Sequence, residues 1–223
     1  MRDEWYGDKR DLVKWGVLLH LADQFSSRSI LQVPYYRPSE WRDLEIDGQR
    51  YPFPDAVVKH FRTIRDIRRL KARCRIQVVP TPFRNRTQYA AAVRRAIAAK
   101  RSGRSIVFLD PDTGLAPRNP GPEHVLGAEL AAIWAQMSPG DVLVFYQHQT
   151  NRSGRPWVEE KRQQFAEALG LPPEAAGLVR APEIARDVAF CFCEKKARAG
   201  VGAVPPSNQL ERTRLAEAMG PRR

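Results

Sequence analysis

The chain has 223 residues, a hydrophobic content of 43% and a formal net charge of +12. This length can bury a core without disulfides or metal ions, so we expect one α/β domain over residues 1–223. No apolar run approaches the roughly 20 residues that cross a bilayer, and the first residues show no secretory pattern. From these features we expect neither an integral membrane protein nor a secreted one, but a cytoplasmic protein without a membrane partner.

Helices and strands are predicted to alternate along the chain. In chain order the pattern predicts a helix at 8–24, a strand at 30–34, a long loop at 35–54, a helix at 55–73, a strand at 76–79, a helix at 87–100, a strand at 106–109, a helix at 123–137, a strand at 141–146, a helix at 157–169, strands at 177–181 and 187–194, and a C-terminal helix at 207–219. Such alternation indicates a doubly wound, mostly parallel sheet in a three-layer α/β/α sandwich of the Rossmann-like class. The loop at 35–54 is long for a compact domain, and loops of that length are often functional.

Two acids follow the apolar strand at 106–109, in the segment Asp110-Pro-Asp112-Thr-Gly114. In open α/β sheets the carboxyl ends of the strands form the ligand-binding edge, which makes Asp110 the first candidate for a catalytic residue. Asp112 fits the turn chemistry of Pro-Asp-x-Gly. The alternative for Asp110 is a purely structural role, capping the turn.

A second polar group follows the strand at 141–146, where residues 147–149 read Gln-His-Gln. Consecutive parallel strands are often neighbours, so this group is expected beside Asp110. His148 is the second catalytic candidate because an ordinary histidine titrates near neutral pH and can act as a general base. The alternative is a solvated loop residue.

The positive charge is concentrated between Lys59 and Arg104, where fifteen Lys and Arg residues accompany one acid, Asp66. The remainder of the chain carries 22 basic and 24 acidic residues. Such a block suits contact with the phosphate backbone of DNA or RNA, although an arginine-rich composition or a solvated helix face would also produce it. The candidate nucleic-acid-binding residues are Arg62, Arg65, Arg69, Arg84 and Arg86.

Several common motifs are absent from the sequence. It contains no P-loop, no G-x-G-x-x-G fingerprint and no G-x-S-x-G elbow. The histidines and cysteines have no metal-ligand spacing, so we expect no metal site of that type. Cys191 and Cys193 alternate within a predicted strand and are expected to be buried thiols.

The opening segment, Gly7 to Leu18, reads GDKRDLVKWGVL and resembles the first helix of bacterial 23S rRNA adenine-N6 methyltransferases, whose pattern is G-N-x-x-D-x-x-K-H-x-x-L. Asp110-Pro111 matches the start of their D-P-P-[YF] motif, and the predicted layout is similar to a class I S-adenosylmethionine (SAM)-dependent methyltransferase domain. The resemblance implies SAM as cofactor and nucleic acid as substrate. In this comparison Asp110 orients the target amine, and Asp8, Lys14 and Tyr35 are the candidate cofactor-binding residues.

The chain departs from that family after its first strand, where prolines and tyrosines replace a glycine-rich turn. Two further hypotheses therefore stay open. One is a non-catalytic nucleic-acid-binding derivative of the same fold. The other is a nuclease in which Asp110, Asp112 and His148 hold Mg²⁺ or Mn²⁺.

Overall fold

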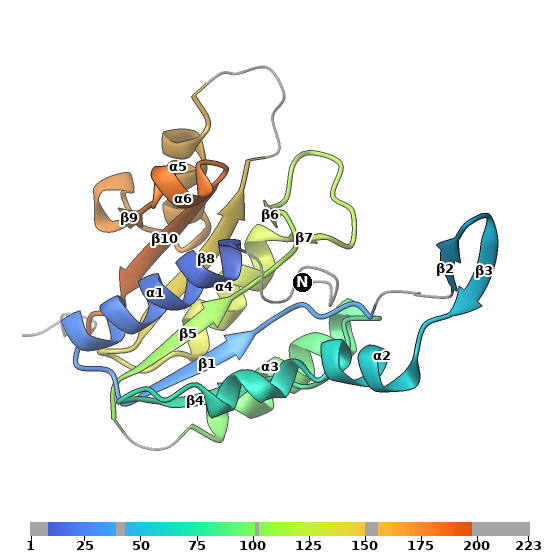
Figure 1. The fold of residues 1–223 in the computed structure, drawn as a ribbon. Helices are drawn as coiled ribbons and strands as arrows, with labels where there is room; N and C mark the ends of the chain where they lie inside the picture. The colour runs from blue at the N-terminus through green and yellow to red at the C-terminus, as the bar shows by residue number, and fades with distance from the viewer. Residues whose placement is uncertain (1–8, 39–42, 101–102, 150–155, 198–223) are drawn as a thin grey trace, which may run out of the picture.

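A computed structural model describes residues 9–38, 43–100, 103–149 and 156–197. Its centre is a six-stranded sheet with the order β4-β1-β5-β8-β10-β9 (Figure 1). The strands are β4 (Arg75–Val78), β1 (Ser29–Val33), β5 (Ser105–Leu109), β8 (Val142–His148), β10 (Val188–Glu194) and β9 (Gly177–Val179). The first four run parallel, and β10 is antiparallel to both of its neighbours.

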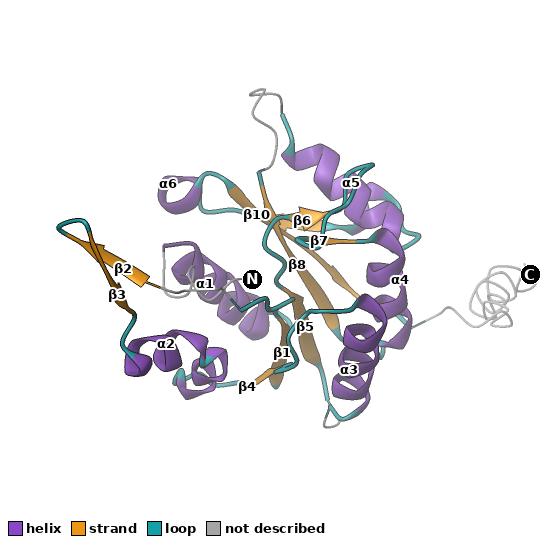
Figure 2. Cartoon of the chain, turned by 90° about the vertical axis from the view of Figure 1, so that its right-hand side faces the viewer, coloured by secondary structure: helices purple, strands orange, loops and turns teal. Residues whose placement is uncertain are grey.

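Helices cover both faces of this sheet, as Figure 2 shows. One face packs against α3 (Arg86–Ala98), α4 (Gly127–Gln136) and α5 (Val158–Ala168), and the other against α1 (Lys9–Gln24) and the short α6 (Pro182–Ala185). The predicted Rossmann-like three-layer sandwich is therefore confirmed. None of the helices in the described part of the chain has the length and hydropathy of a membrane span.

Side chains alternate strictly between the two cores. In β5, Val107 and Leu109 join the core under α3, α4 and α5, whereas Ile106 and Phe108 join the core under α1. This alternation follows from the two-residue period of a strand, and all five residues of β5 are buried. The side chain that follows the last residue of a strand is therefore expected on the face that the alternation gives it. This rule places each candidate site residue on one face of the sheet.

The predicted loop at 35–54 contains a hairpin, formed by β2 (Asp43–Ile46) and β3 (Gln49–Pro52). The turn is Asp47-Gly48, and both residues have positive φ angles, 51° and 78°. These angles fit a type I′ turn, which matches the twist of a two-stranded ribbon. The Asp-Gly pair was the available signal for this hairpin.

The predicted helix at 55–73 is wrong in its extent. Helix α2 (Asp55–Arg62) stops at Thr63, and a separate 3₁₀ helix, η2 (Ile64–Arg69), follows. The Thr63 hydroxyl donates to the carbonyl of Lys59 at 2.7 Å, so it occupies an acceptor of the last helical turn. The break lets Ile64 bury itself against Tyr36 and Val78.

The predicted helix at 123–137 begins later, as α4 at Gly127. Before it, β7 (His124–Val125) pairs in parallel with β6 (Gly114–Leu115). A 3₁₀ turn, η3 (Pro173–Ala175), precedes β9. The predicted C-terminal helix at 207–219 lies outside the described residues.

Candidate functional site

Polar side chains gather on the α1 face at the carboxyl edge of the sheet. Gln32, Asp110 and His148 occupy the same pleat positions as the residues that pack under α1, because each lies an even number of residues from them. Strands β5 and β8 are hydrogen-bonded neighbours, which confirms that the segments after them lie side by side.

Lys14 is at the centre of this cluster. Its Nζ lies 2.6 Å from Asp11 Oδ1 and 3.0 Å from Asp110 Oδ2. Gln32 donates to the same Asp110 oxygen at 2.8 Å. The Lys14 side chain is 7% exposed and that of Asp110 is 2% exposed, so this ion pair is shielded from water.

The electrostatics of the pair follow from burial and proximity. Burial raises the pKa of Asp110 above its usual range, and the Lys14 ammonium opposes part of that rise. Burial alone would lower the pKa of Lys14, but Asp110 and Asp11 together raise it above its usual range. The lysine is therefore a fixed cation at neutral pH. Its Nζ also lies 5.4 Å from the centre of the Tyr146 ring.

His148 forms a second polar group with partners that sequence reasoning did not find. Its Nε2 lies 3.0 Å from Asp187 Oδ2, and Arg10 Nε donates to the same oxygen at 3.2 Å. Burial opposes ionisation of Asp187, but the Arg10 hydrogen bonds outweigh it and hold the pKa of Asp187 below its usual range. The histidine is thus oriented by a carboxylate, an arrangement that suits a general base.

The turn that carries both acids is locked from beneath by Gln147. Its Oε1 accepts from the Leu115 amide at 2.9 Å, and its Nε2 donates to the Thr113 carbonyl at 3.2 Å. Gly114 has a φ of +130°, and a Cβ at that position would lie 2.3 Å from the Gln147 amide. Only glycine fits over this side chain, which explains the glycine of the Asp-Pro-Asp-Thr-Gly segment.

Asp112 anchors the chain that leads to the hairpin. Arg37 pairs with it, with Nε donating to Oδ2 at 3.1 Å. Although burial opposes ionisation, the Arg37 guanidinium helps to hold the pKa of Asp112 below its usual range. Asp112 therefore has a structural partner in addition to its turn chemistry.

Tyr35 lies on the opposite face of the sheet from Lys14. Its ring packs against Phe83 and Tyr89 at centroid distances of 5.3 and 5.0 Å, and its amide donates to the Tyr89 hydroxyl at 2.8 Å. Its φ is +47°, so the chain turns sharply away from β1 without a glycine. Left-handed non-glycine residues of this kind cluster at functional sites.

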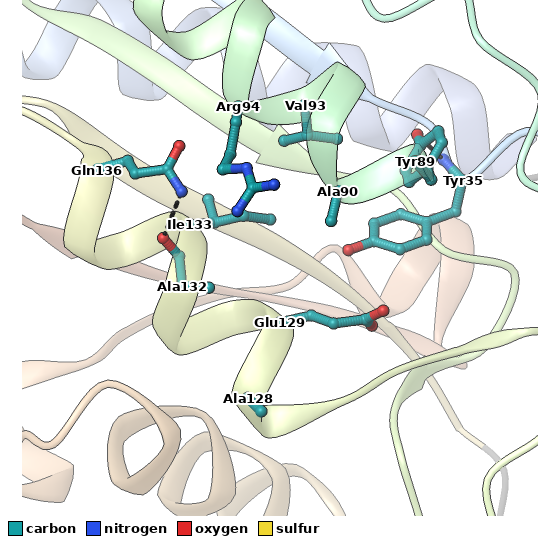
Figure 3. A pocket seen from close by; sticks show the side chains of 10 residues that line it. All are labelled: Tyr35, Tyr89, Ala90, Val93, Arg94, Ala128, Glu129, Ala132, Ile133 and Gln136. Carbon is teal, nitrogen blue, oxygen red and sulfur yellow. Dashed lines mark hydrogen bonds between the residues drawn. The ribbon is translucent and has the colours of Figure 1, made fainter. Parts of the chain in front are cut away.

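A groove of about 210 Å³ extends from Tyr35 between α3 and α4 (Figure 3). Its floor is mainly apolar, with Tyr35 and Tyr89 at one end and Gln136 at the other. Glu129 on its wall accepts from the Leu126 amide at 2.9 Å and pairs with Arg86. The groove is separate from the Lys14 cluster because it lies on the other face of the sheet.

The predicted nucleic-acid-binding residues fall into two groups. Arg62, Arg65, Arg69 and Arg84 are exposed on α2, on η2 and in the loop after β4. Arg86 instead bonds to Glu129 and to the carbonyls of Gly121 and His124, so its guanidinium holds an internal loop.

Some members of the site carried weak sequence signals that were not interpreted. Gln32 is a polar residue in the buried strand SILQV, and Tyr146 ends an otherwise apolar run. Arg10 and Asp187 are 177 residues apart and had no pattern that could connect them. Asp8 lies outside the described residues.

No group of three or more His, Cys, Asp or Glu side chains is arranged to hold a metal ion in the described part of the chain. The acids and the histidine are instead bonded to lysine, arginine and each other. The nuclease hypothesis therefore has no supporting geometry among these residues.

Comparisons with known proteins give only distant similarities. No protein-family model and no curated protein matches the chain. Among solved structures, a presumed methyltransferase from Thermobifida fusca is 15% identical with a TM-score of 0.42, over 85% of this chain and 80% of that one. Human methyltransferase-like protein 13, solved with SAH, is 12% identical with a TM-score of 0.38, over 96% and 93%. These values are too low to carry an argument about activity.

Proposed function

We propose that this protein is a SAM-dependent methyltransferase that acts on nucleic acid, with an exocyclic amine such as adenine N6 as the target. The observation that carries the proposal is the buried Asp110 at the carboxyl end of a central parallel strand, held by Lys14 and Gln32. The carboxyl edge is where such folds bind ligands, and the Lys14 helix has the sequence that resembles the methyltransferase motif.

The residues at this edge are compatible with the cofactor. SAM, when bound, would supply an activated methyl group and carries a sulfonium cation, which suits an edge with the carboxylates of Asp110 and Asp112. The sharp left-handed turn at Tyr35 replaces the glycine that usually lets the chain leave the first strand. Asp110, Asp112 and the backbone around Tyr35 are the groups that would hold the cofactor.

The chain's own residues have defined tasks in this proposal. The Asp110 carboxylate accepts a hydrogen bond from the target amine and fixes its orientation. Lys14 favours the ionised form of that carboxylate and so opposes part of the effect of its burial. His148, oriented by Asp187, accepts the proton that the amine loses. The exposed arginines of α2 and η2 bind phosphates.

One observation favours the non-catalytic alternative. Asp110 Oδ2 already pairs with the Lys14 ammonium and accepts a hydrogen bond from Gln32, and the Asp110 side chain is only 2% exposed. A pair closed in this way could serve stability alone. In that case the basic surface would bind nucleic acid without cofactor.

Calorimetry separates the two proposals. Full-length protein is titrated with SAM and with SAH, and compared with Asp110→Asn and with the exposed control Glu174→Gln. The methyltransferase proposal expects micromolar binding that is weakened at least tenfold in Asp110→Asn and unchanged in the control. An absence of binding at millimolar SAM, together with nucleic-acid binding that needs no SAM, would establish the non-catalytic alternative.

A further inference from the structure

The outward side of helix α1 is apolar at its centre, although the helix lies on the outside of the sheet (Figure 2). Leu12 is 67% exposed, the largest value among the exposed large hydrophobic residues of the described chain. Gly16, one turn later, is also exposed, and the half-buried Leu19 follows it. A single exposed leucine is ordinary, but the outward side of a surface helix is normally polar.

These residues belong to a series with regular spacing, which we call the α1 stripe. Its members are Lys9, Leu12, Gly16, Leu19 and Asp23. They follow one another at steps of three and four residues, which keeps them in one row along the helix. Rows with this spacing form the seam along which two helices pack side by side. The stripe lies on the opposite side of α1 from the buried Lys14 and Leu18.

Gly16 is the member of the stripe that packing inside the domain does not explain. A Cβ at this position would meet no atom of the surrounding structure within 4 Å. Glycine is less favourable than alanine in the interior of a helix, so a residue with a side chain would fit and would stabilise α1. A glycine on a packing seam allows the backbone of a second helix to approach closely. The position therefore fits the crossing point with a partner helix.

The two ends of the stripe carry opposite charges. Lys9 lies seven residues before Gly16 and Asp23 lies seven residues after it, and both charged residues are exposed. If two copies of α1 cross at Gly16 in antiparallel orientation, Lys9 of each protomer faces Asp23 of its partner. A parallel arrangement would bring like charges together at both ends. The stripe is thus complementary to an antiparallel copy of itself, as a twofold-symmetric interface requires.

Helix α6 adds a flank to this surface. It packs against α1, and its Ile184 is 46% exposed. The sixteen residues of α1 span about 24 Å at 1.5 Å per residue. One helix pair of this length with a short flank makes a small interface, and small interfaces are weak and transient. The association should therefore depend strongly on protein concentration.

From this arrangement we infer that the protein forms a twofold-symmetric homodimer through the outward side of α1, with the two helices antiparallel and crossing at Gly16. Burial of Leu12 and Leu19 supplies the apolar contact, and the ion pairs between Lys9 and Asp23 set the orientation. The inference does not depend on the proposed function, because the stripe and Lys14 lie on opposite sides of the helix. In the dimer, the partner holds from outside the helix that carries Lys14.

Sedimentation equilibrium of the full-length protein measures the monomer–dimer constant. The protein is compared from about 1 to 200 µM, in about 0.15 M salt to screen its positive net charge. Leu12→Gln should weaken dimerisation about tenfold or more, because it removes the central apolar contact. Leu70→Gln is the matched control: Leu70 is 39% exposed at the end of η2, and its replacement should leave the constant unchanged.

Two further substitutions test the crossing point and the orientation. Gly16→Gln should weaken dimerisation about tenfold or more, because its bulk separates the helices. The melting temperature at 1 µM should be unchanged or higher, since glutamine is the better helix former. Lys9→Glu should weaken dimerisation by placing like charges opposite each other. The double variant Lys9→Glu/Asp23→Lys should restore the constant to within about threefold of the parent value, and both changes suit the helix dipole.

Three results would overturn the inference. The first is a parent protein that stays monomeric up to 200 µM. The second is a dimer that neither Leu12→Gln nor Gly16→Gln weakens, since it would use another surface. The third is a double charge variant as weak as Lys9→Glu, which would contradict the antiparallel orientation. SAM calorimetry on the same samples keeps the two proposals apart, because a monomeric protein that binds SAM refutes only the dimer.

Discussion

Replacing Lys14 by methionine should strongly destabilise the fold, because the lysine neutralises two carboxylates in a buried cluster. Asp11 and Asp110 both bond to its ammonium, and the Asp110 side chain is 2% exposed. Breaking a buried ion pair by removing one partner typically costs about 3–5 kcal/mol. At about 2–4 °C per kcal/mol for a domain of this size, the melting temperature should fall by roughly 6–20 °C.

The cost should depend on pH, with a sign set by Asp110. Burial already raises the pKa of Asp110, so the folded state holds the proton more tightly than the unfolded state. The free energy of unfolding therefore falls as the pH rises from the unfolded-state pKa to the folded-state pKa of this carboxyl. In Lys14→Met the ammonium that opposes this rise is absent. The pKa of Asp110 in the folded state therefore rises further, and the pH range over which stability falls extends upward. The loss of stability should therefore be larger at pH 7.5 than at about pH 3, where both states hold most of the proton.

Guanidinium unfolding followed by tryptophan fluorescence at both pH values measures the effect. Lys9→Met, an exposed lysine of the same helix, is the control and should change stability by less than about 0.5 kcal/mol. The double variant Lys14→Met/Asp110→Asn should recover part of the loss, because it removes the unpaired charge. A cost below about 1 kcal/mol at pH 7.5, or one independent of pH, would refute a buried ion pair at this place.

Three further predictions concern the surrounding structure. Gly114→Ala should destabilise the protein by more than about 2 kcal/mol in thermal unfolding, whereas Gly170→Ala, also at positive φ but with open space around it, should cost only about 1 kcal/mol. Asp187→Asn should lower the melting temperature more at pH 7 than at about pH 3. A carboxylate with a lowered pKa stabilises the fold at pH values above its unfolded-state pKa and loses this contribution on acidification. An equal effect at both pH values would contradict the ion pair with Arg10. With a thiol reagent at pH 8, the half-buried Cys74 should react well before the two buried cysteines of β10, and all three should react after unfolding; rapid reaction of all three in the folded state would contradict their burial.

The layered fold could be predicted because local patterns determine it. Runs such as residues 106–109 are apolar at every position, which requires a strand covered on both faces. Asp110 could be placed at the ligand-binding edge for the same reason. The sequence also placed Lys14 near this region, through a resemblance rather than through geometry.

The ion pairs could not be predicted because they depend on the stacking of α1 on the sheet. Lys14 and Asp110 are 96 positions apart and meet only when that helix packs on the pleat face shared by Gln32 and Asp110. The break at Thr63 was also missed, because the apolar spacing continues beyond it. There a single hydroxyl and the burial of Ile64 outweigh the helical pattern.

The closure of Asp110 determines what catalysis would require of this fold. A target amine can reach the carboxylate only if Lys14 yields its place on Oδ2, and Lys14 is fixed to the start of α1 together with Asp11. The preceding turn of α1 is held by the ion pair of Arg10 with Asp187. Opening the site therefore means breaking two ion pairs on adjacent turns, one buried and one partly exposed, and the buried pair dominates the cost. A bound nucleic-acid substrate could offset that cost only through contacts made when α1 has moved, because a ligand shifts an equilibrium by its differential affinity for the two states. A protein that merely binds nucleic acid has no need of this movement, so the stability of the Lys14–Asp110 pair in the bound complex is the physical property that separates the two proposals.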